Sequence, residues 1–279
     1  MDGTLKICGI THPADARAAV DAGADAIGLN FVPASRRYID LDTARAILAV
    51  TPSDVMTVGV FRNFPVGKIL AITDDLGLSA AQLHGDGPPD VTQAVAASVA
   101  TVIKVLAPDP PAIHTLVDEH AADIVMLDAP TPGGGVAFDW DLVGDLVTRH
   151  KVLLAGGLRP DDVAEAIRQV RPWGVDVATG VEASSGRNDP DALVRLVSNA
   201  RRTHQALTSM SSDLDDSRHE HTSTRAHEHT STRAHEHTSA DGDQRTPTGA
   251  HADGRWPLVL YGCCTGARKR RRPGPRDRA

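Results

Sequence analysis

The chain alternates between short apolar runs and longer segments in which apolar residues recur every three or four positions. The short runs are rich in Val, Ile and Leu, as is typical of strands buried on both faces of a sheet. We predict eight strands, at Leu5–Ile10, Ala26–Phe31, Met56–Phe61, Ala81–His84, Val102–Leu106, Ile124–Asp128, Val152–Ala155 and Val175–Ala178. Each is followed by a segment with helical spacing, and these segments are Ala14–Ala22, Leu41–Val50, Val66–Leu76, Val91–Ala97, Ala112–His120, Trp140–Arg149, Asp161–Val170 and Pro190–Arg201.

This alternation predicts an α/β fold with a parallel sheet, because parallel neighbours need a crossover connection that is usually a helix. Eight strand–helix units within residues 1–207 predict a single (β/α)8 TIM barrel as the catalytic domain. An open doubly wound sheet is the alternative. Such a sheet usually has fewer strands, and no G-x-G-x-x-G follows the first strand here.

Residues 208–279 differ in composition, with few apolar residues and many Ser, Thr, His, Asp and Arg. The octad HEHTSTRA occurs at His219–Ala226 and again at His227–Ala234. A repeat of this length without an apolar face cannot bury enough surface to offset chain entropy, so we expect a disordered tail. Its histidines could bind nickel or zinc, and the basic end Arg268–Arg272 could contact nucleic acid, but a solvated disordered segment is the simpler interpretation of both.

Composition and charge exclude several classes of protein. The net charge of −7 argues against a nucleic-acid partner for the whole chain. No apolar run reaches the roughly 18 residues that a membrane-spanning helix needs. The first residues lack the pattern of a signal peptide, and three cysteines are too few for a disulfide framework. We therefore expect a cytoplasmic monomer that does not associate with membranes.

The carboxyl ends of the predicted strands, where barrels of this class place their catalytic groups, hold the most distinctive side chains. Cys8 ends the first strand and Asp128 ends the sixth. A buried cysteine is more often a small hydrophobe, and an aspartate at this place could simply cap the following loop. Together, however, they offer one base and one acid at a barrel mouth. Such a pair suits proton transfer on a small substrate without a metal.

Charged and titratable residues at other strand ends are candidates for substrate binding. Arg36 and Arg37 follow the second strand, where a guanidinium could pair with a carboxylate, although a loop arginine is usually solvated. Asp176 lies among valines in the eighth strand and needs a partner there, so it is either structural or substrate-binding. His84 could be a core histidine, a metal ligand or a substrate contact. The body of the sequence has no second histidine at ligand spacing, which disfavours a metal.

Two glycine-containing turns follow the seventh and eighth strands. LAGGLRPDDV contains Gly156 and Gly157, and VATGVEASSG contains Thr179 and Gly180. Both leave backbone N–H groups open, and the loops after these two strands are the recurrent phosphate site of TIM barrels. A third run, PGGGVAFDW at residues 132–140, is interpreted as a flexible loop over the mouth.

These motifs, taken in order, resemble those of the phosphoribosylanthranilate isomerase family of tryptophan biosynthesis. The resemblance runs from about Lys6 to about Arg202 and does not include the tail. Each motif is weak alone, but eight in order with barrel spacing are highly specific. They are KICGIT, SRRYI, VGVFRN, QLHG, the LD of MLDA, GGGVAFDW, LAGGLRPDDV and VDVATGVEASSGRND.

The resemblance implies an Amadori rearrangement of N-(5-phosphoribosyl)anthranilate, a small-molecule phosphosugar, without a metal or organic cofactor. It implies that Asp128 is the general acid and that Cys8 is the base that removes the C2′ proton. It also implies that Arg37 holds the anthranilate carboxylate. Gly157 and Gly180, with their neighbours Gly156 and Thr179, would bind the phosphate, and Asp176 and His84 would lie near the substrate.

Two alternatives stay open at this point. One is another phosphosugar-processing barrel enzyme, although a ribulose-phosphate epimerase would need paired metal-binding histidines that the sequence body lacks. The other is a barrel that binds a phosphosugar without catalysis, against which the pair of Cys8 and Asp128 argues.

Overall fold

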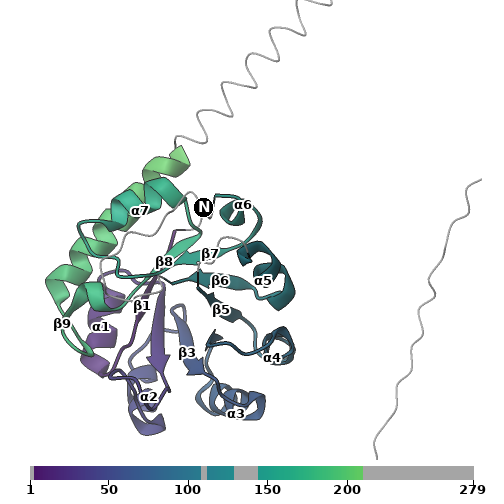
Figure 1. The fold of residues 1–279 in the computed structure, drawn as a ribbon. Coiled ribbons are helices and arrows are strands. Elements are labelled where there is room, and N and C mark those ends of the chain that lie inside the picture. Colours follow the sequence, from purple (N-terminus) through teal and green to yellow (C-terminus); the bar gives the residue numbers. More distant parts are fainter. Residues whose placement is uncertain (1–2, 108–111, 129–143, 210–279) are drawn as a thin grey trace, which may run out of the picture. The chain divides into compact units, whose positions relative to one another are not determined.

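Eight parallel strands close into a barrel in their sequence order, which confirms the predicted TIM barrel (Figure 1). This computed structural model describes residues 3–107, 112–128 and 144–209. The strands are β1 (Thr4–Cys8), β2 (Ala26–Asn30), β3 (Met56–Arg62), β4 (Ala80–His84), β5 (Val102–Leu106), β6 (Ile124–Leu127), β7 (Val152–Leu154) and β8 (Gly174–Val177).

Helices surround the barrel as an outer ring (Figure 1). Local signals position them: Pro13 opens the first helix, where a proline costs no hydrogen bond, and Gly77 ends the third in a left-handed conformation. The helices are α1 (Pro13–Asp21), α2 (Leu41–Leu48), α3 (Val66–Leu76), α4 (Pro89–Ala96), α5 (Ile113–His120), α6 (Leu146–Arg149) and α7 (Val163–Val170), and residues 190–209 are also helical.

The two faces of the strands form two separate layers of the core. Leu5 and Ile7 of β1 face the helices and belong to the large cluster between the sheet and the helical ring. The alternate positions face the barrel interior, as the period of two along a strand requires. That inner layer is filled by Ala26, Val58, Ala80, Ile103, Ile124, Met126, Leu153 and Ala155.

The last helix runs beyond the predicted end at Arg201. Its buried positions continue at helical spacing through Ala200, His204 and Leu207, and Leu207 is only 9% exposed. No glycine or proline interrupts this part of the sequence, so the helix continues to residue 209. Most of the tail predicted at 208–279 lies outside the described residues.

A short hairpin that the sequence did not predict follows β8. It consists of the 3-10 turn η2 (Thr179–Val181) and the paired strands β9 (Glu182–Ser184) and β10 (Arg187–Asn188). The predicted loop at 132–140 and the start of the helix predicted at Trp140 lie outside the described residues. Among those that are described, no helix has the length and apolar character needed to cross a membrane.

Candidate active site

The carboxyl ends of the strands bring the predicted residues to one end of the barrel. Cys8 and His84 are the last residues of β1 and β4, and Asp128 directly follows β6. Asp176 lies one residue before the end of β8. Because all eight strands are parallel, these ends share one side of the barrel. The sequence prediction that these residues meet at a common mouth agrees with this topology.

Strand pairing places Lys6 beside Asp176. The two residues are opposite each other where β1 pairs with β8, and both are buried. Nζ of Lys6 donates a hydrogen bond to Oδ1 of Asp176 at 2.6 Å. Asp176 therefore has the partner that a buried carboxylate requires. Although burial opposes the charged form, the Asp176 carboxylate holds the pKa of Lys6 above its ordinary value, so the ammonium is charged.

Cys8 lies on the same face of β1 as Lys6, two residues further along. In the pairing with β2 it is opposite Gly28. A Cβ at position 28 would lie 2.7 Å from Sγ of Cys8 and 3.1 Å from Nζ of Lys6, so only glycine leaves room for both groups. Burial raises the pKa of the Cys8 thiol, and the Lys6 charge opposes this rise. The resting side chain is consequently a thiol at neutral pH.

Arg37 forms a two-bond ion pair with Glu182, which the sequence analysis did not identify. Nε donates to Oε1 at 2.6 Å and Nη2 donates to Oε2 at 2.8 Å. Nη2 also donates to Oγ1 of Thr179 at 2.9 Å. The hydrogen bond with Glu182 raises the pKa of Arg37. Arg36 is exposed.

Glu182 also ties the hairpin together, because its Oε1 accepts a hydrogen bond from the backbone N–H of Gly186. Burial raises the pKa of Glu182, but the hydrogen bonds from Arg37 and Gly186 outweigh burial and lower it overall. The loop after β2 and the hairpin after β8 are thus joined by a charged pair. The guanidinium keeps its Nη1 group outside this pair.

His84 is held by Gln82 from the same strand. Nε2 of Gln82 and Nε2 of His84 lie 2.7 Å apart, and because an amide nitrogen only donates, the imidazole nitrogen accepts. Burial, together with the charges of Lys6, Arg62 and Lys104, lowers the pKa of His84 to about 4. The ring is therefore neutral at pH 7 and offers Nδ1–H as a donor.

The two glycine turns come together at the ends of β7 and β8. Gly156 and Gly157 have φ values of 111° and 71°, which side chains rarely adopt. Gly180 approaches the loop after β7 so closely that a Cβ would collide with the backbone carbonyl of Leu158. Thr179 is exposed beside it. This close approach of two turns is the arrangement expected for a phosphate cradle.

Asp128 follows the last residue of β6, and its backbone N–H donates to the carbonyl of Leu106 at 3.3 Å. The residue is partly exposed. Its position one step beyond the strand places it at the mouth, where Cys8 also lies.

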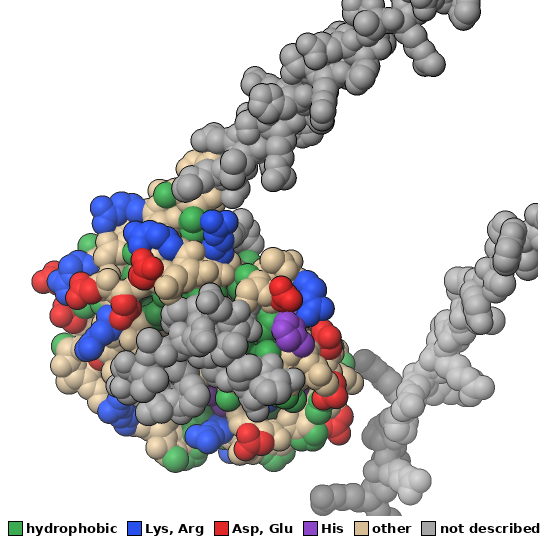
Figure 2. All heavy atoms as spheres, turned by 45° about the horizontal axis from the view of Figure 1, so that its top comes forward, with side chains coloured by type: hydrophobic (Ala, Val, Ile, Leu, Met, Phe, Trp, Pro, Cys, Tyr) green, Lys and Arg blue, Asp and Glu red, His purple; other side chains and the backbone are tan. Residues whose placement is uncertain are grey.

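On the face drawn in Figure 2, acidic and basic side chains are interspersed and do not gather by sign.

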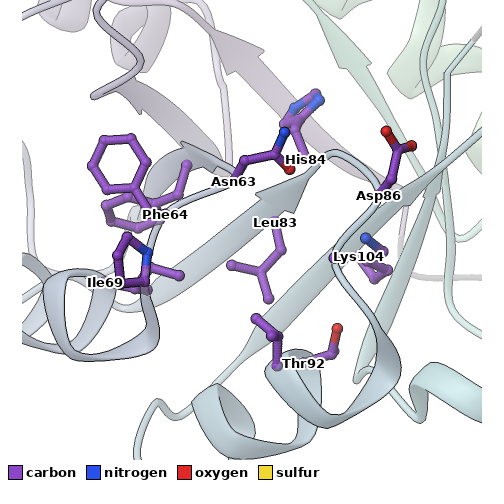
Figure 3. Close-up of a pocket in the computed structure, with 12 residues that line it drawn as sticks. Asn63, Phe64, Ile69, Leu83, His84, Asp86, Thr92 and Lys104 are labelled. Carbon is purple, nitrogen blue, oxygen red and sulfur yellow. The ribbon is translucent and has the colours of Figure 1, made fainter.

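A cavity of about 470 Å³ borders the site on its β3–β5 side. Phe61, Phe64 and Leu83 form much of its apolar lining, and His84, Asp86 and Lys104 supply polar groups (Figure 3). Nζ of Lys104 donates a hydrogen bond to the carbonyl oxygen of Gly85 at 2.8 Å. Of the candidate site residues, only His84 lines this cavity.

Sequence reasoning missed Lys6, Gly28 and Glu182 as parts of the site. A signal existed for Lys6, because a lysine between Leu5 and Ile7 in a buried strand must face an interior partner. Nothing local distinguishes Gly28 or Glu182, since their importance comes from neighbours on other strands.

Comparisons with known proteins agree on one family. The model of the N-(5'phosphoribosyl)anthranilate (PRA) isomerase family matches residues 5–199. An N-(5'-phosphoribosyl)anthranilate isomerase from Myxococcus xanthus is 43% identical over 206 residues, covering 72% of this chain and 97% of the relative.

Solved structures point the same way. The phosphoribosyl anthranilate isomerase of Thermotoga maritima superimposes with a TM-score of 0.68 at 38% identity, covering 71% of this chain and 98% of the other. A further isomerase structure, in complex with reduced 1-(o-carboxyphenylamino)-1-deoxyribulose 5-phosphate, has a TM-score of 0.65 at 37% identity and the same coverage. With a family model spanning most of the barrel and relatives at about 40% identity over nearly their whole length, the chain belongs to the phosphoribosylanthranilate isomerase family.

Proposed function

We propose that this protein converts N-(5′-phosphoribosyl)anthranilate into 1-(o-carboxyphenylamino)-1-deoxyribulose 5-phosphate, an isomerisation in tryptophan biosynthesis. The observation that carries the proposal is the family match over residues 5–199, on a barrel that has Cys8 and Asp128 at its strand ends. The intact acid and base argue against a barrel that only binds a phosphosugar.

The two anionic ends of the substrate would bind on different loops. The turns at Gly156, Gly157 and Gly180 would hold the phosphate through their backbone N–H groups. The side-chain hydroxyl of Thr179 would contribute a further hydrogen bond. Arg37 would hold the anthranilate carboxylate through Nη1, since Glu182 occupies Nε and Nη2. The reacting carbons would then lie between these ends, over Cys8 and Asp128.

The first chemical step would be ring opening with Asp128 as the general acid. Asp128 gives its proton to the furanose ring oxygen as the C1′–O bond breaks, and the electron pair of that bond stays on the oxygen. The anthranilate nitrogen donates its lone pair to C1′, which forms a protonated Schiff base. Protonation of the leaving oxygen is the kind of assistance that a positioned carboxylic acid supplies.

The second step would be removal of the C2′ proton by the thiolate of Cys8. The electron pair of the C2′–H bond forms the C1′=C2′ double bond, and the electrons of the C=N double bond return to nitrogen. The resulting enolamine loses its enol proton and gains one at C1′, which gives the ketone product. His84 and Asp176 would lie beside the sugar, where His84 Nδ1–H is a neutral donor.

The assembly state and location of the chain belong to the same proposal. We infer a monomer that acts in the cytoplasm, in line with the sequence expectations above. The related isomerase of T. maritima is described as dimeric, so sedimentation of the purified chain is the decisive measurement.

Turnover of phosphoribosylanthranilate by the purified chain tests the activity directly, through the change in anthranilate fluorescence. Growth of a tryptophan auxotroph that lacks this isomerase tests it in cells. We expect turnover and complementation. Tight binding of the substrate without turnover would instead support the phosphosugar-binding alternative, and turnover of a different phosphosugar alone would support another barrel enzyme.

A further inference from the structure

Lys6 is a charged side chain in the barrel interior that the mechanism above does not use. It is 1% exposed, and its ammonium lies close to a carboxylate and to a thiol. The carboxylate is Asp176 on β8, and the thiol is Cys8 on the same strand as Lys6. Burying a lysine costs free energy unless its charge is matched, so a position of this kind calls for an explanation.

The geometry around Gly28 shows that the ammonium and the thiol share one small space. Sγ of Cys8 and Nζ of Lys6 lie 2.7 Å and 3.1 Å from the point where a Cβ of residue 28 would be. Of these two contacts, the one with the thiol is the closer, although a Cβ at position 28 would also crowd the ammonium. Because residue 28 is a glycine, the thiol can approach the ammonium.

We propose that Lys6 is a positioning residue that stabilises the thiolate form of Cys8, and that the Asp176 carboxylate competes with this thiolate for the Lys6 ammonium. The role of the thiolate as the catalytic base rests on the proposed function, but the effect on the thiol does not. Formation of the thiolate is a simple proton loss to solvent, and the negative charge that develops on Sγ then faces the ammonium.

The charges that face Cys8 act in opposite directions. Lys6 on its own strand and Arg37 from the loop after β2 lower the pKa of the thiol, whereas burial and Asp176 on β8 raise it. Arg37 is already paired with Glu182, and β2 contributes only Gly28 at this point. Lys6 is therefore the cation on which the thiolate depends most, and Asp176 both anchors that cation and competes for it.

The opposite signs give a test that a purely structural role would not pass. In a C263S/C264S background, Cys8 is the only cysteine of the chain, so the pH dependence of its alkylation by iodoacetamide reports the thiol pKa. We expect Lys6→Met to raise this pKa by about one unit or more, which slows alkylation about tenfold at a pH below the pKa. We expect Asp176→Asn to lower the pKa and speed alkylation.

Lys104→Met provides the matched control, because Lys104 is also a buried lysine. Its ammonium donates a hydrogen bond to the carbonyl oxygen of Gly85, and it is not among the charges that act on Cys8. We expect it to leave the thiol pKa unchanged. Lys6→Met leaves Asp176 buried without its partner, so circular dichroism must accompany each variant. If Lys6→Met does not fold, Asp176→Asn still decides the matter, because it keeps the ammonium.

Unchanged alkylation in both variants, or a shift of the same sign in both, would overturn the proposal. In the active enzyme, the acidic limb of the kcat/KM profile should move with the alkylation pKa. Shifted alkylation in a protein that has no isomerase activity would refute the proposed function while leaving the inference about Lys6 and Cys8 intact.

Discussion

The guanidinium of Arg37 and the carboxylate of Glu182 form two parallel hydrogen bonds, with Nε–Oε1 at 2.6 Å and Nη2–Oε2 at 2.8 Å. These residues are 145 positions apart in the chain, and their pairing joins the loop after β2 to the hairpin after β8. The pair fixes the plane of the guanidinium. Arg37 is thereby presented to a ligand in one orientation, at no further cost in side-chain entropy when the ligand binds.

Arg37→Ala should lower kcat/KM by about 30- to 1,000-fold, the scale of losing a charge-assisted hydrogen bond of roughly 2–4 kcal/mol. Arg36→Ala should be mild, because Arg36 is exposed and lies outside the ion pair. Arg37→Lys should restore only part of the lost activity, since lysine cannot make the planar two-bond contact that Arg37 makes with Glu182. Steady-state kinetics of the three variants measures this.

Arg37→Ala also leaves the Glu182 carboxylate without its partner. The melting temperature of the Arg37→Ala variant should therefore fall below that of the Arg36→Ala variant. Equal kinetic defects in the two alanine variants, or a larger defect in Arg36→Ala, would mean that Arg37 is not the carboxylate clamp.

Cys8→Ser and Asp128→Asn should each lower kcat by at least about 100-fold while largely preserving substrate binding. A hydroxyl is far harder to deprotonate than a thiol, and an amide cannot give up a proton as a carboxylic acid does. Single-turnover kinetics and substrate titration separate the two effects. Near-normal turnover in either variant would remove that residue from the mechanism.

Gly180→Ala should weaken phosphate binding, because its Cβ would collide with the carbonyl of Leu158 and push the two turns apart. We expect a loss of about 10- to 100-fold in kcat/KM, mostly through KM. Gly67→Ala is the matched control. Gly67 is an exposed residue of α3 with nothing within 4 Å of the new methyl group, so this variant should keep its activity and gain about 0.5–1 kcal/mol of stability. If both variants behave alike, the contact between Gly180 and Leu158 does not shape the site.

His84 makes the stability of the barrel depend on pH. Its pKa is about 4 in the folded protein and 6.5 in the unfolded reference, so between these values the unfolded chain binds more protons. The free energy of unfolding should therefore decrease as the pH falls from about 6.5 to about 4, by up to about 3 kcal/mol from this residue.

Urea unfolding of His84→Gln across this pH range tests the assignment. Glutamine does not titrate, so the decline should become shallower. It should not vanish, because burial also lowers the pKa of His120 and His204. An unchanged slope would show that His84 is not the group responsible.

Shortening the chain separates the barrel from the predicted tail. A variant that ends at Ser209 should keep its melting temperature and activity, because the segment after it has the composition of a disordered chain. A variant that ends at Arg202 should melt at least about 5 °C lower, since it loses Leu207 from the core and burial of this side chain contributes about 2 kcal/mol. Loss of activity in the longer variant would show that the tail contributes to the fold or to the site.

The sequence determined the local features of this protein. Runs of Val, Ile and Leu between helical segments predicted all eight strands, because periodicity depends only on near neighbours in the chain. The alternation of side chains along a strand also requires Lys6 and Cys8 to lie on the opposite face of β1 from Leu5 and Ile7, as the structure has them. Motif order in turn predicted the family to which the comparisons assign the chain.

Only the tertiary structure decided which distant groups meet. The sequence indicated that Asp176 needs a partner, but the closure of β1 onto β8 identified Lys6, 170 positions away, as that partner. Glu182 became visible only once the hairpin after β8 was placed beside the loop that carries Arg37. Gly28 is an ordinary strand residue until the pairing of β2 with β1 places it opposite Cys8. The physical reason is that contacts across the barrel depend on strand register, which is fixed when the sheet closes and not by any local pattern of residues.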